Sequence, residues 1–243
     1  MDHNFWEIRS AKYDKLYWTK DESYIDAIIK VGDLKKSDLV LDVGTGTGTM
    51  GRAILPFVNH VIGLDNSDAM LDKGKWGGFS VVKWDISDRI FQDGLFDKIF
   101  ARMVFHHILD NLDRAFLRCY DLLKDKGKLI IAEGIPPSDD QEIIQWYTDM
   151  FALKEERRVF STGELEHYFR KNGFQNVRSH IHAMKSFNVH NWVINSGLTK
   201  NISDKIIKMH YSAPKKVKDA YNMKIVDGIC FIDTENAIVV GEK

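Results

Sequence analysis

A short glycine-rich segment at residues 40–48 limits most strongly what this chain can fold into. The run Val-Leu-Asp-Val is followed by glycine at positions 44, 46 and 48. Because glycine has no β-carbon, a ligand can approach the backbone closely there and the turn can adopt positive φ angles. An apolar strand that ends in such a turn and leads into a helix is typical of open α/β sheets, which bind ligands at the carboxyl ends of their strands. The free N–H groups of that helix favour an anionic group.

Short apolar runs alternate with amphipathic segments through residue 135, which indicates a parallel sheet with crossover helices. We expect strands at residues 39–43, 61–64, 80–84, 96–101 and 128–132. The apolar spacing predicts one helix from Met50 to Val58 and another from Leu112 to Leu123, with Asp110 as the N-cap of the second.

The chain changes character after residue 135, where Pro136 and Pro137 break it. Ser138 with Gln141, and Ser161 with Glu164, predict capping boxes at the starts of two helices, the second ending at Gly173. Residues 174–187 are expected to form a sixth strand, residues 188–221 short helices, and residues 224–233 and 237–241 a hairpin around Thr234-Glu235-Asn236.

The expected fold is an α/β Rossmann-like three-layer sandwich. Its sheet is mostly parallel and seven-stranded and ends in an antiparallel hairpin. Residues 1–243 form one domain in this prediction, with helical lid insertions at residues 136–160 and 188–221.

Composition excludes several classes of protein. With 243 residues, a net charge of −1 and no basic block, the chain is not expected to bind nucleic acid. Two distant cysteines, Cys119 and Cys230, exclude a cysteine-based zinc site and argue against a disulfide-rich secreted domain. His180 and His182 share a strand face without a third ligand nearby, so no metal site is predicted. No apolar run approaches about 18 residues. We expect a cytoplasmic monomer or homodimer without a membrane partner.

The glycine segment admits two cofactor classes. Gly46-x-Gly48-x-x-Gly51 matches the dinucleotide fingerprint, and Asp65 follows at a tolerable distance. Asp42 argues against a dinucleotide, because its carboxylate would repel a pyrophosphate but attract the α-ammonium of a methionine moiety. Asp65 ends the second strand and can accept hydrogen bonds from both hydroxyls of a ribose. An NAD(P)-dependent oxidoreductase is the main alternative, and a non-catalytic cofactor-binding module is another.

Five segments, in order and at matching spacing, resemble the class I S-adenosylmethionine-dependent methyltransferases. The resemblance is strongest to the broad group that includes the ubiquinone and menaquinone biosynthesis C-methyltransferases, and it covers about residues 10–135. The segments are Asp42–Gly48, Gly63–Leu71, Lys83–Ile86, Phe96–Phe100 and Leu122–Leu129. The resemblance implies S-adenosylmethionine as the cofactor and methyl transfer to a small-molecule acceptor as the function.

The resemblance also implies roles for residues around the methionine and ribose portions of the cofactor. Gly44 and Gly46 would line these portions, and Asp65 would hold the ribose. The backbone of Arg102 would lie near the sulfonium. Tyr13 resembles a tyrosine that many relatives place over the cofactor, although a position in the core is an equal alternative.

On the adenine side, the resemblance implies that Asn66 and Met70 flank the base. Asp85 would accept a hydrogen bond from the adenine amino group, with the backbone of Ile86 nearby. A surface carboxylate is the alternative for Asp85. The predicted cofactor-binding set is completed by two residues of the glycine segment, Asp42 and Thr45.

Methyl transfer requires the in-line approach of a nucleophile in a water-poor site, and a base only where the acceptor carries a proton of high pKa. His106 and His107 follow the fourth strand and face the expected methyl position, and an imidazole titrates near neutrality. Packing or helix capping is the alternative. Glu133 ends the fifth strand and could orient the substrate. These three residues are the catalytic candidates.

Aromatic and methionine side chains in the two insertions predict a lid over a small acceptor that is apolar or aromatic/heterocyclic. Helical spacing makes ordinary packing the alternative for most of them, namely Trp146, Tyr147, Met150, Phe151, Phe187, Trp192 and Tyr211. The fourth strand ends in Ala101–Val104, not in the Asn/Asp-Pro-Pro-Tyr motif of nucleic-acid amino-methyltransferases.

Overall fold

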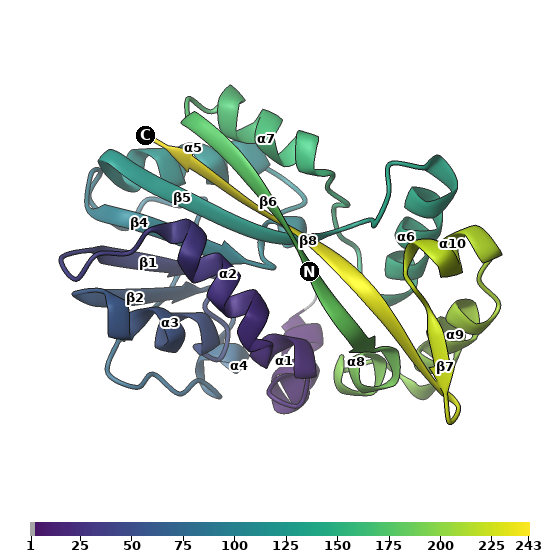
Figure 1. The fold of residues 1–243 in the computed structure, drawn as a ribbon. Helices are drawn as coiled ribbons and strands as arrows, with labels where there is room; N and C mark the ends of the chain where they lie inside the picture. Colours follow the sequence, from purple (N-terminus) through teal and green to yellow (C-terminus); the bar gives the residue numbers. More distant parts are fainter. Residues whose placement is uncertain (1–2) are drawn as a thin grey trace.

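A mixed sheet of eight strands forms the centre of the computed structural model, which describes residues 3–243 (Figure 1). Neighbouring strands follow the order β3-β2-β1-β4-β5-β8-β6, and the short β7 pairs with β8. The first five strands are mutually parallel, whereas β8 is antiparallel to β5, β6 and β7. The strands are β1 Leu39–Val43, β2 His60–Asp65, β3 Ser80–Lys83, β4 Phe96–Arg102, β5 Leu123–Ile135, β6 Gln175–Asn188, β7 Lys224–Val226 and β8 Ile229–Glu242.

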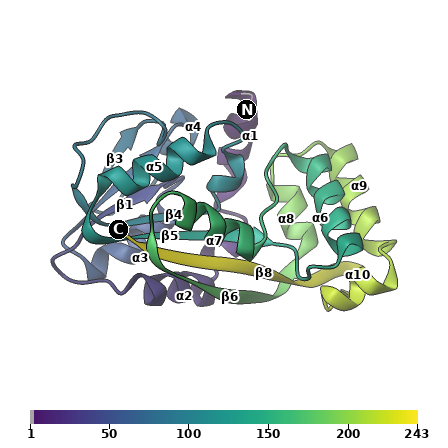
Figure 2. The ribbon, with the colours of Figure 1, turned by 90° about the horizontal axis from the view of Figure 1, so that it is seen from above.

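Helices cover both faces of the sheet, as the alternation of buried side chains along the strands requires. Val40 faces a core that contains α2 and α3, whereas its neighbour Leu41 faces a core that contains α5 and α7. Figure 2 shows α2 on one side of the sheet and α5 and α7 on the other. The helices are α1 His3–Tyr13, α2 Glu22–Gly32, α3 Thr49–Ile54, α4 Asp68–Leu71, α5 Leu112–Leu122, α6 Gln141–Lys154, α7 Thr162–Lys171, α8 Val189–Asn195, α9 Lys200–Tyr211 and α10 Lys215–Ala220, with 3₁₀ turns η1 Tyr17–Lys20, η2 Leu55–Phe57 and η3 Phe105–His107.

The predicted hairpin around residues 234–236 is wrong, although the expected three-layer fold is confirmed. Residues 229–242 form one continuous strand that pairs with β5 on one side and with β6 on the other. The turn lies earlier, at Asp227 and Gly228, whose φ angles are +49° and +75°. An Asp-Gly pair suits the two-residue turn in which both central residues have positive φ. The strand expected at residues 224–233 is therefore divided between β7 and the start of β8.

Several predicted helix boundaries also differ from the structure. The helix after β1 ends at Ile54 because Pro56 has no N–H for a helical bond, and the chain continues as the 3₁₀ turn η2. Asn111, not Asp110, occupies the N-cap of α5. Asp140 caps α6 by accepting from the N–H of Glu142, and Ser138 accepts from the N–H of Asp140 instead.

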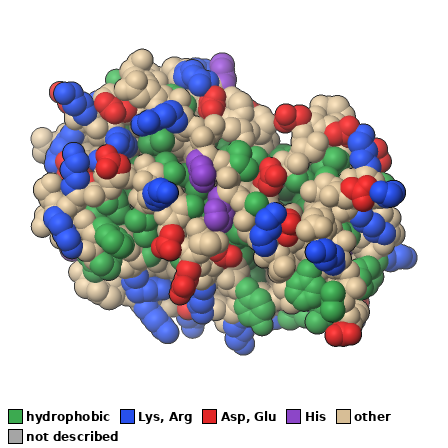
Figure 3. All heavy atoms as spheres, viewed as in Figure 1, with side chains coloured by type: hydrophobic (Ala, Val, Ile, Leu, Met, Phe, Trp, Pro, Cys, Tyr) green, Lys and Arg blue, Asp and Glu red, His purple; other side chains and the backbone are tan. Residues whose placement is uncertain are grey.

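The segments predicted as insertions lie together at one end of the sheet, at the right of Figure 1. Helix α6 packs against α9 and α10, while α8 contacts α1, α9 and β8. The assignment of residues 1–243 to one domain stays a prediction. Within residues 3–243, no helix combines the length and apolar character that crossing a bilayer requires. Cationic and anionic side chains are interspersed over the face drawn in Figure 3.

Candidate active site

The glycine turn after β1 is held against the end of β2 by backbone hydrogen bonds. The N–H of Thr45 donates to the carbonyl of Leu64 at 3.0 Å, and the N–H of Gly46 donates to Asp65 Oδ2 at 2.9 Å. Gly44 and Gly46 have φ angles of +64° and +58°, which L side chains rarely adopt. The turn is therefore fixed, and its backbone is open to a ligand.

A cavity of about 410 Å³ lies against this turn at the carboxyl ends of the parallel strands. Most of the predicted cofactor-binding residues line it, namely Tyr13, Gly44, Gly46, Asp65, Asn66, Met70, Asp85, Ile86 and Arg102. The structure thus brings together side chains from α1, β2, α4 and the loop after β3.

Asp65 retains acceptor capacity toward this cavity. Its Oδ1 accepts from the N–H of Ser67 at 2.9 Å and its Oδ2 from Gly46, and each carboxylate oxygen has a second lone pair. Burial raises the pKa of Asp65. Farther along the wall, Asn66 Nδ2 donates to Asp85 Oδ2 at 3.2 Å. The carboxyl of Asp65 is suited to the paired hydroxyls of a ribose.

Asp42 and Thr45 do not line the cavity, and their direct contact with a cofactor stays a prediction. The hydroxyl of Thr45 donates to Asp42 Oδ2 at 2.7 Å, and Asp42 is only 1% exposed. Burial raises the pKa of Asp42 from its ordinary value of 3.8 to about 6. The carboxyl of Asp42 therefore supports the turn from inside the end of the strand.

A second cavity, of about 90 Å³, adjoins the first toward the lid helices. The two share Trp6, Tyr13, Met103 and His107. Five side chains of the predicted lid line the second cavity, namely Tyr147, Met150, Phe151, Phe187 and Trp192. Trp146 and Tyr211 do not line it. An aromatic compartment therefore opens beside the cavity at the glycine turn.

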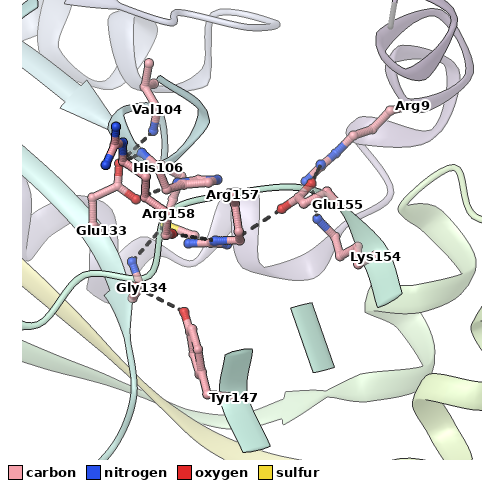
Figure 4. Close-up of polar contacts among 11 residues, drawn as sticks. Arg9, Val104, His106, Glu133, Gly134, Tyr147, Lys154, Glu155, Arg157 and Arg158 are labelled. Atoms are coloured by element: carbon pink, nitrogen blue, oxygen red, sulfur yellow. Dashed lines mark hydrogen bonds and ion pairs between the residues drawn. The ribbon is translucent and has the colours of Figure 1, made fainter. Parts of the chain in front are cut away.

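His106 and Glu133 form a buried pair. His106 Nδ1 lies 2.6 Å from Glu133 Oε2, while Glu133 Oε1 accepts from the N–H groups of Val104 at 3.0 Å and His106 at 3.3 Å (Figure 4). Burial raises the pKa of Glu133 to about 7 and lowers that of His106 well below 6.5. Glu133 is fully buried and lines neither cavity, and its role in orienting a substrate stays a prediction.

His107 is the catalytic candidate that borders both cavities. Its ring meets Trp6 edge-on at 5.1 Å, and its buried Nδ1 has no hydrogen-bond partner among the described residues. Burial, followed by the proximity of His106, lowers the pKa of His107 well below 6.5. The ring is therefore neutral, and its buried Nδ1 is a hydrogen-bonding atom that the described residues leave unused.

Sequence reasoning missed a buried cluster of charges in the wall of the second cavity. Glu155 Oε2 accepts from Arg9 Nη1 at 2.8 Å and from Lys154 Nζ at 2.5 Å, and Arg157 Nη1 lies 3.6 Å from Glu155 Oε1 (Figure 4). The signal in the sequence was the run Lys-Glu-Glu-Arg-Arg at residues 154–158, inside a predicted lid. Such runs are usually solvated, so the pattern alone did not indicate burial.

Three of these groups could also serve as metal ligands. Candidate ligand atoms of His106, His107 and Glu155 all lie within 4.8 Å of one another. The sequence had suggested only His180 and His182 as possible metal ligands. Arg9 and Lys154 already occupy one oxygen of Glu155. The positive charges of Arg9 and Lys154, which lie in direct contact with Glu155, disfavour the binding of a divalent cation there.

Comparison with known families decides between the two cofactor classes. A family model described as a methyltransferase domain matches residues 17–179. The chain belongs to this methyltransferase family. The sequence-based assignment to the methyltransferases is thereby confirmed, and a solved structure that shares the fold, phosphoethanolamine N-methyltransferase 2 of Haemonchus contortus, holds S-adenosyl-L-methionine. The NAD(P)-dependent alternative is not supported.

Curated relatives of this methyltransferase differ in length and acceptor. Phosphoethanolamine N-methyltransferase 2 of Caenorhabditis elegans is 31% identical over 163 residues, which are 63% of this chain and 36% of that protein. Demethylmenaquinone methyltransferase of Thermotoga maritima is 34% identical over 120 residues, 47% of this chain and 49% of that enzyme. The chain thus spans about a third to a half of these two relatives.

Solved structures share the fold over most of the chain. The YcgJ protein of Bacillus subtilis superimposes with a TM-score of 0.76 at 20% identity, covering 90% of this chain and 97% of that one. Phosphoethanolamine N-methyltransferase 2 of Haemonchus contortus gives 0.62 at 19% identity, covering 90% and 52%. At these identities the similarity concerns the fold.

Proposed function

We propose that the protein transfers a methyl group from S-adenosylmethionine to a small molecule bound in the aromatic cavity beside the glycine turn. The observation that carries this proposal is the meeting of the two cavities at Trp6, Tyr13, Met103 and His107. A cofactor bound at the glycine turn would direct its methyl toward that junction. The relatives from Caenorhabditis elegans and Thermotoga maritima, which are named for phosphoethanolamine and demethylmenaquinone, support a small-molecule acceptor.

Within this proposal, the residues predicted to bind the cofactor divide by position. Asp65 accepts from the ribose hydroxyls, with Asn66 and Asp85 on the adenine side. Gly44 and Gly46 leave space for the chain that carries the sulfonium, and Tyr13 covers it.

The acceptor compartment supplies chiefly position and exclusion of water. Holding a nucleophile in line with the methyl group can provide a large part of the rate, because the donor sulfur is already cationic. His107 accepts a hydrogen bond from the acceptor, and the His106–Glu133 pair fixes the loop that carries it. Neutral histidines of low pKa favour this positioning role over that of a strong base.

The test combines binding with turnover. Calorimetry with S-adenosylhomocysteine and with NAD(P) should detect only the first. Turnover of labelled S-adenosylmethionine against a metabolite panel then separates an enzyme from a non-catalytic binding module. Binding of NAD(P) alone, or tight binding of S-adenosylhomocysteine without any turnover, would contradict the proposal.

His107→Ala tests the role at the junction. We expect unchanged affinity for S-adenosylhomocysteine and turnover reduced at least tenfold. His167→Ala is the matched control, since this histidine lies on α7, outside both cavities. Equal turnover in the wild type and His107→Ala would remove His107 from the mechanism.

A further inference from the structure

The wall of the acceptor cavity carries more positive than negative charge. Arg9, Lys154 and Arg157 reach it from α1 and from the end of α6, and Glu155 is the carboxylate that contacts all three (Figure 4). The cavity's other carboxyl, Glu235, is partly exposed. Its charged neighbour is Lys185, so it does not offset this cluster.

The neighbouring histidines contribute no charge to this cluster. Both are neutral at neutral pH, because burial lowers the pKa of His106 and of His107. Glu133, which is bonded to His106, has a pKa raised to about 7 by burial. One fully ionised carboxylate therefore faces two guanidinium groups and the amine of Lys154 in a buried space.

Arg157 is the least satisfied of these side chains. Its side chain is only 3% exposed, and it stacks over Phe151 with the guanidinium carbon 4.2 Å from the ring centroid. Nε donates to the carbonyl of Arg158 at 3.2 Å, but the buried Nη2 has no hydrogen-bond partner in the part of the chain that the structure describes. A buried cationic donor without a partner is costly, and a ligand that fills the position would relieve that cost.

Lys154 supports the same interpretation. Its side chain is 2% exposed, and its Nζ lies 5.8 Å from the rings of both Phe151 and Trp192. Burial, with repulsion from Arg9, lowers the pKa of Lys154 from 10.5 to about 7. The amine of Lys154 pairs with Glu155, a carboxylate that it shares with Arg9 and Arg157, so a bound anion would add negative charge to this cluster.

We propose that the methyl acceptor carries an anionic group, a carboxylate or a phosphate, that Arg157 and Lys154 bind in this cavity. Guanidinium groups bind both anions through two parallel hydrogen bonds. Phe151 and Trp192 would pack against the body of the acceptor. This inference rests on the proposed function, because it assigns the anion to the compound that is methylated.

Calorimetry with three probes of matched ring size tests the proposal on the whole protein. Benzoate and phenyl phosphate carry the two anionic groups, and benzyl alcohol is the neutral counterpart. We expect at least one anion to bind tenfold or more tightly than benzyl alcohol. The difference between benzoate and phenyl phosphate then identifies the preferred anion.

Two variants and one control locate the binding. Lys154→Met and Arg157→Gln should each weaken the preferred anion at least tenfold while leaving benzyl alcohol and S-adenosylhomocysteine unchanged. Lys171→Met removes an exposed cation paired with Asp113 and should change nothing. Lys154→Met keeps the test decisive if Arg157→Gln fails to fold, because Glu155 retains its ion pairs with Arg9 and Arg157 in that variant.

Equal binding of all three probes, or anion binding that neither variant weakens, would overturn the proposal. Failure of the methyltransferase assignment is separately visible. In that case S-adenosylhomocysteine would not bind, while the anion preference and its loss in Lys154→Met would persist.

Discussion

The imidazole Nδ1 of His106 lies 2.6 Å from Oε2 of Glu133, and the other oxygen of the same carboxyl accepts two backbone N–H groups of the loop after β4. One buried carboxyl thus fixes both a side chain and the loop that leads to His107. The sequence drew attention to Glu133 because it lies near the end of the fifth strand. In the structure its carboxyl forms hydrogen bonds inside the protein.

Two replacements of Glu133 should distinguish the loss of its hydrogen bonds from the loss of its charge alone. Glu133→Ala leaves three buried donors without acceptors and should lower the free energy of unfolding by about 3–5 kcal/mol. Glu133→Gln keeps an acceptor for both N–H groups and should cost about 1 kcal/mol, with His106 shifting to its other tautomer. Urea unfolding measures both. Equal losses in the two variants would contradict the hydrogen-bond network.

Asp65→Asn should weaken the binding of S-adenosylhomocysteine. The amide keeps one acceptor oxygen but presents a donor where the second hydroxyl is expected, which costs about 1–3 kcal/mol, or roughly tenfold to a hundredfold in affinity. Calorimetry measures the change. Asp68→Asn is the control, because Asp68 is exposed and pairs with Lys83. Affinity equal to that of the wild type would show that the ribose lies elsewhere.

A β-carbon at Gly44 should hinder the binding of S-adenosylhomocysteine at the glycine turn. It would lie 2.3 Å from Cγ2 of Val104, at a φ angle of +64°. Gly44→Ala should reduce S-adenosylhomocysteine affinity at least tenfold, and adding Val104→Ala should restore part of it by removing the contact. Gly163→Ala, where a β-carbon meets nothing within 4 Å, should have no effect. Full affinity in Gly44→Ala would argue against a tight backbone approach.

Asp42 should make stability depend on pH in a defined direction. Its folded pKa of about 6 exceeds the ordinary 3.8, so the folded state holds the proton more tightly. This contribution is complete below about pH 4 and is lost as the pH rises to about 6, a difference of about 3 kcal/mol. Asp42→Asn should lack this loss, so the variant gains on the wild type between pH 4 and pH 7. A constant difference in urea unfolding across this range would refute the assignment.

Turnover should not require a divalent metal ion. The cations around Glu155 oppose metal binding at His106 and His107, so dialysis against EDTA is expected to leave kcat and KM unchanged. Zinc or magnesium that restores activity lost on chelation would instead assign the three-residue group to a metal.

The sequence was sufficient for the parallel half of the fold and for the residues that line the cavity at the glycine turn, because strand ends and glycine turns are local signals. Asp65, for example, lies at the end of β2, where its position in the motif predicts it. The lid was predicted only as helices, since the contacts of α6 with α9 and α10 join distant segments. The Arg9–Glu155 pair spans 146 positions, and no local pattern reveals that these charges are buried together.

Strand β8 runs without a break from the cavity beside the lid helices into the hydrophobic core of the sheet. Its Ile232, Thr234 and Asn236 line the acceptor cavity, while Ala237 and Val239 belong to the core beneath the parallel strands. A chimera that exchanges acceptor preference between relatives therefore cannot be cut between two halves of the protein. The helices can be transplanted, but the recipient's β8 has to stay whole, with its inward side chains altered one by one.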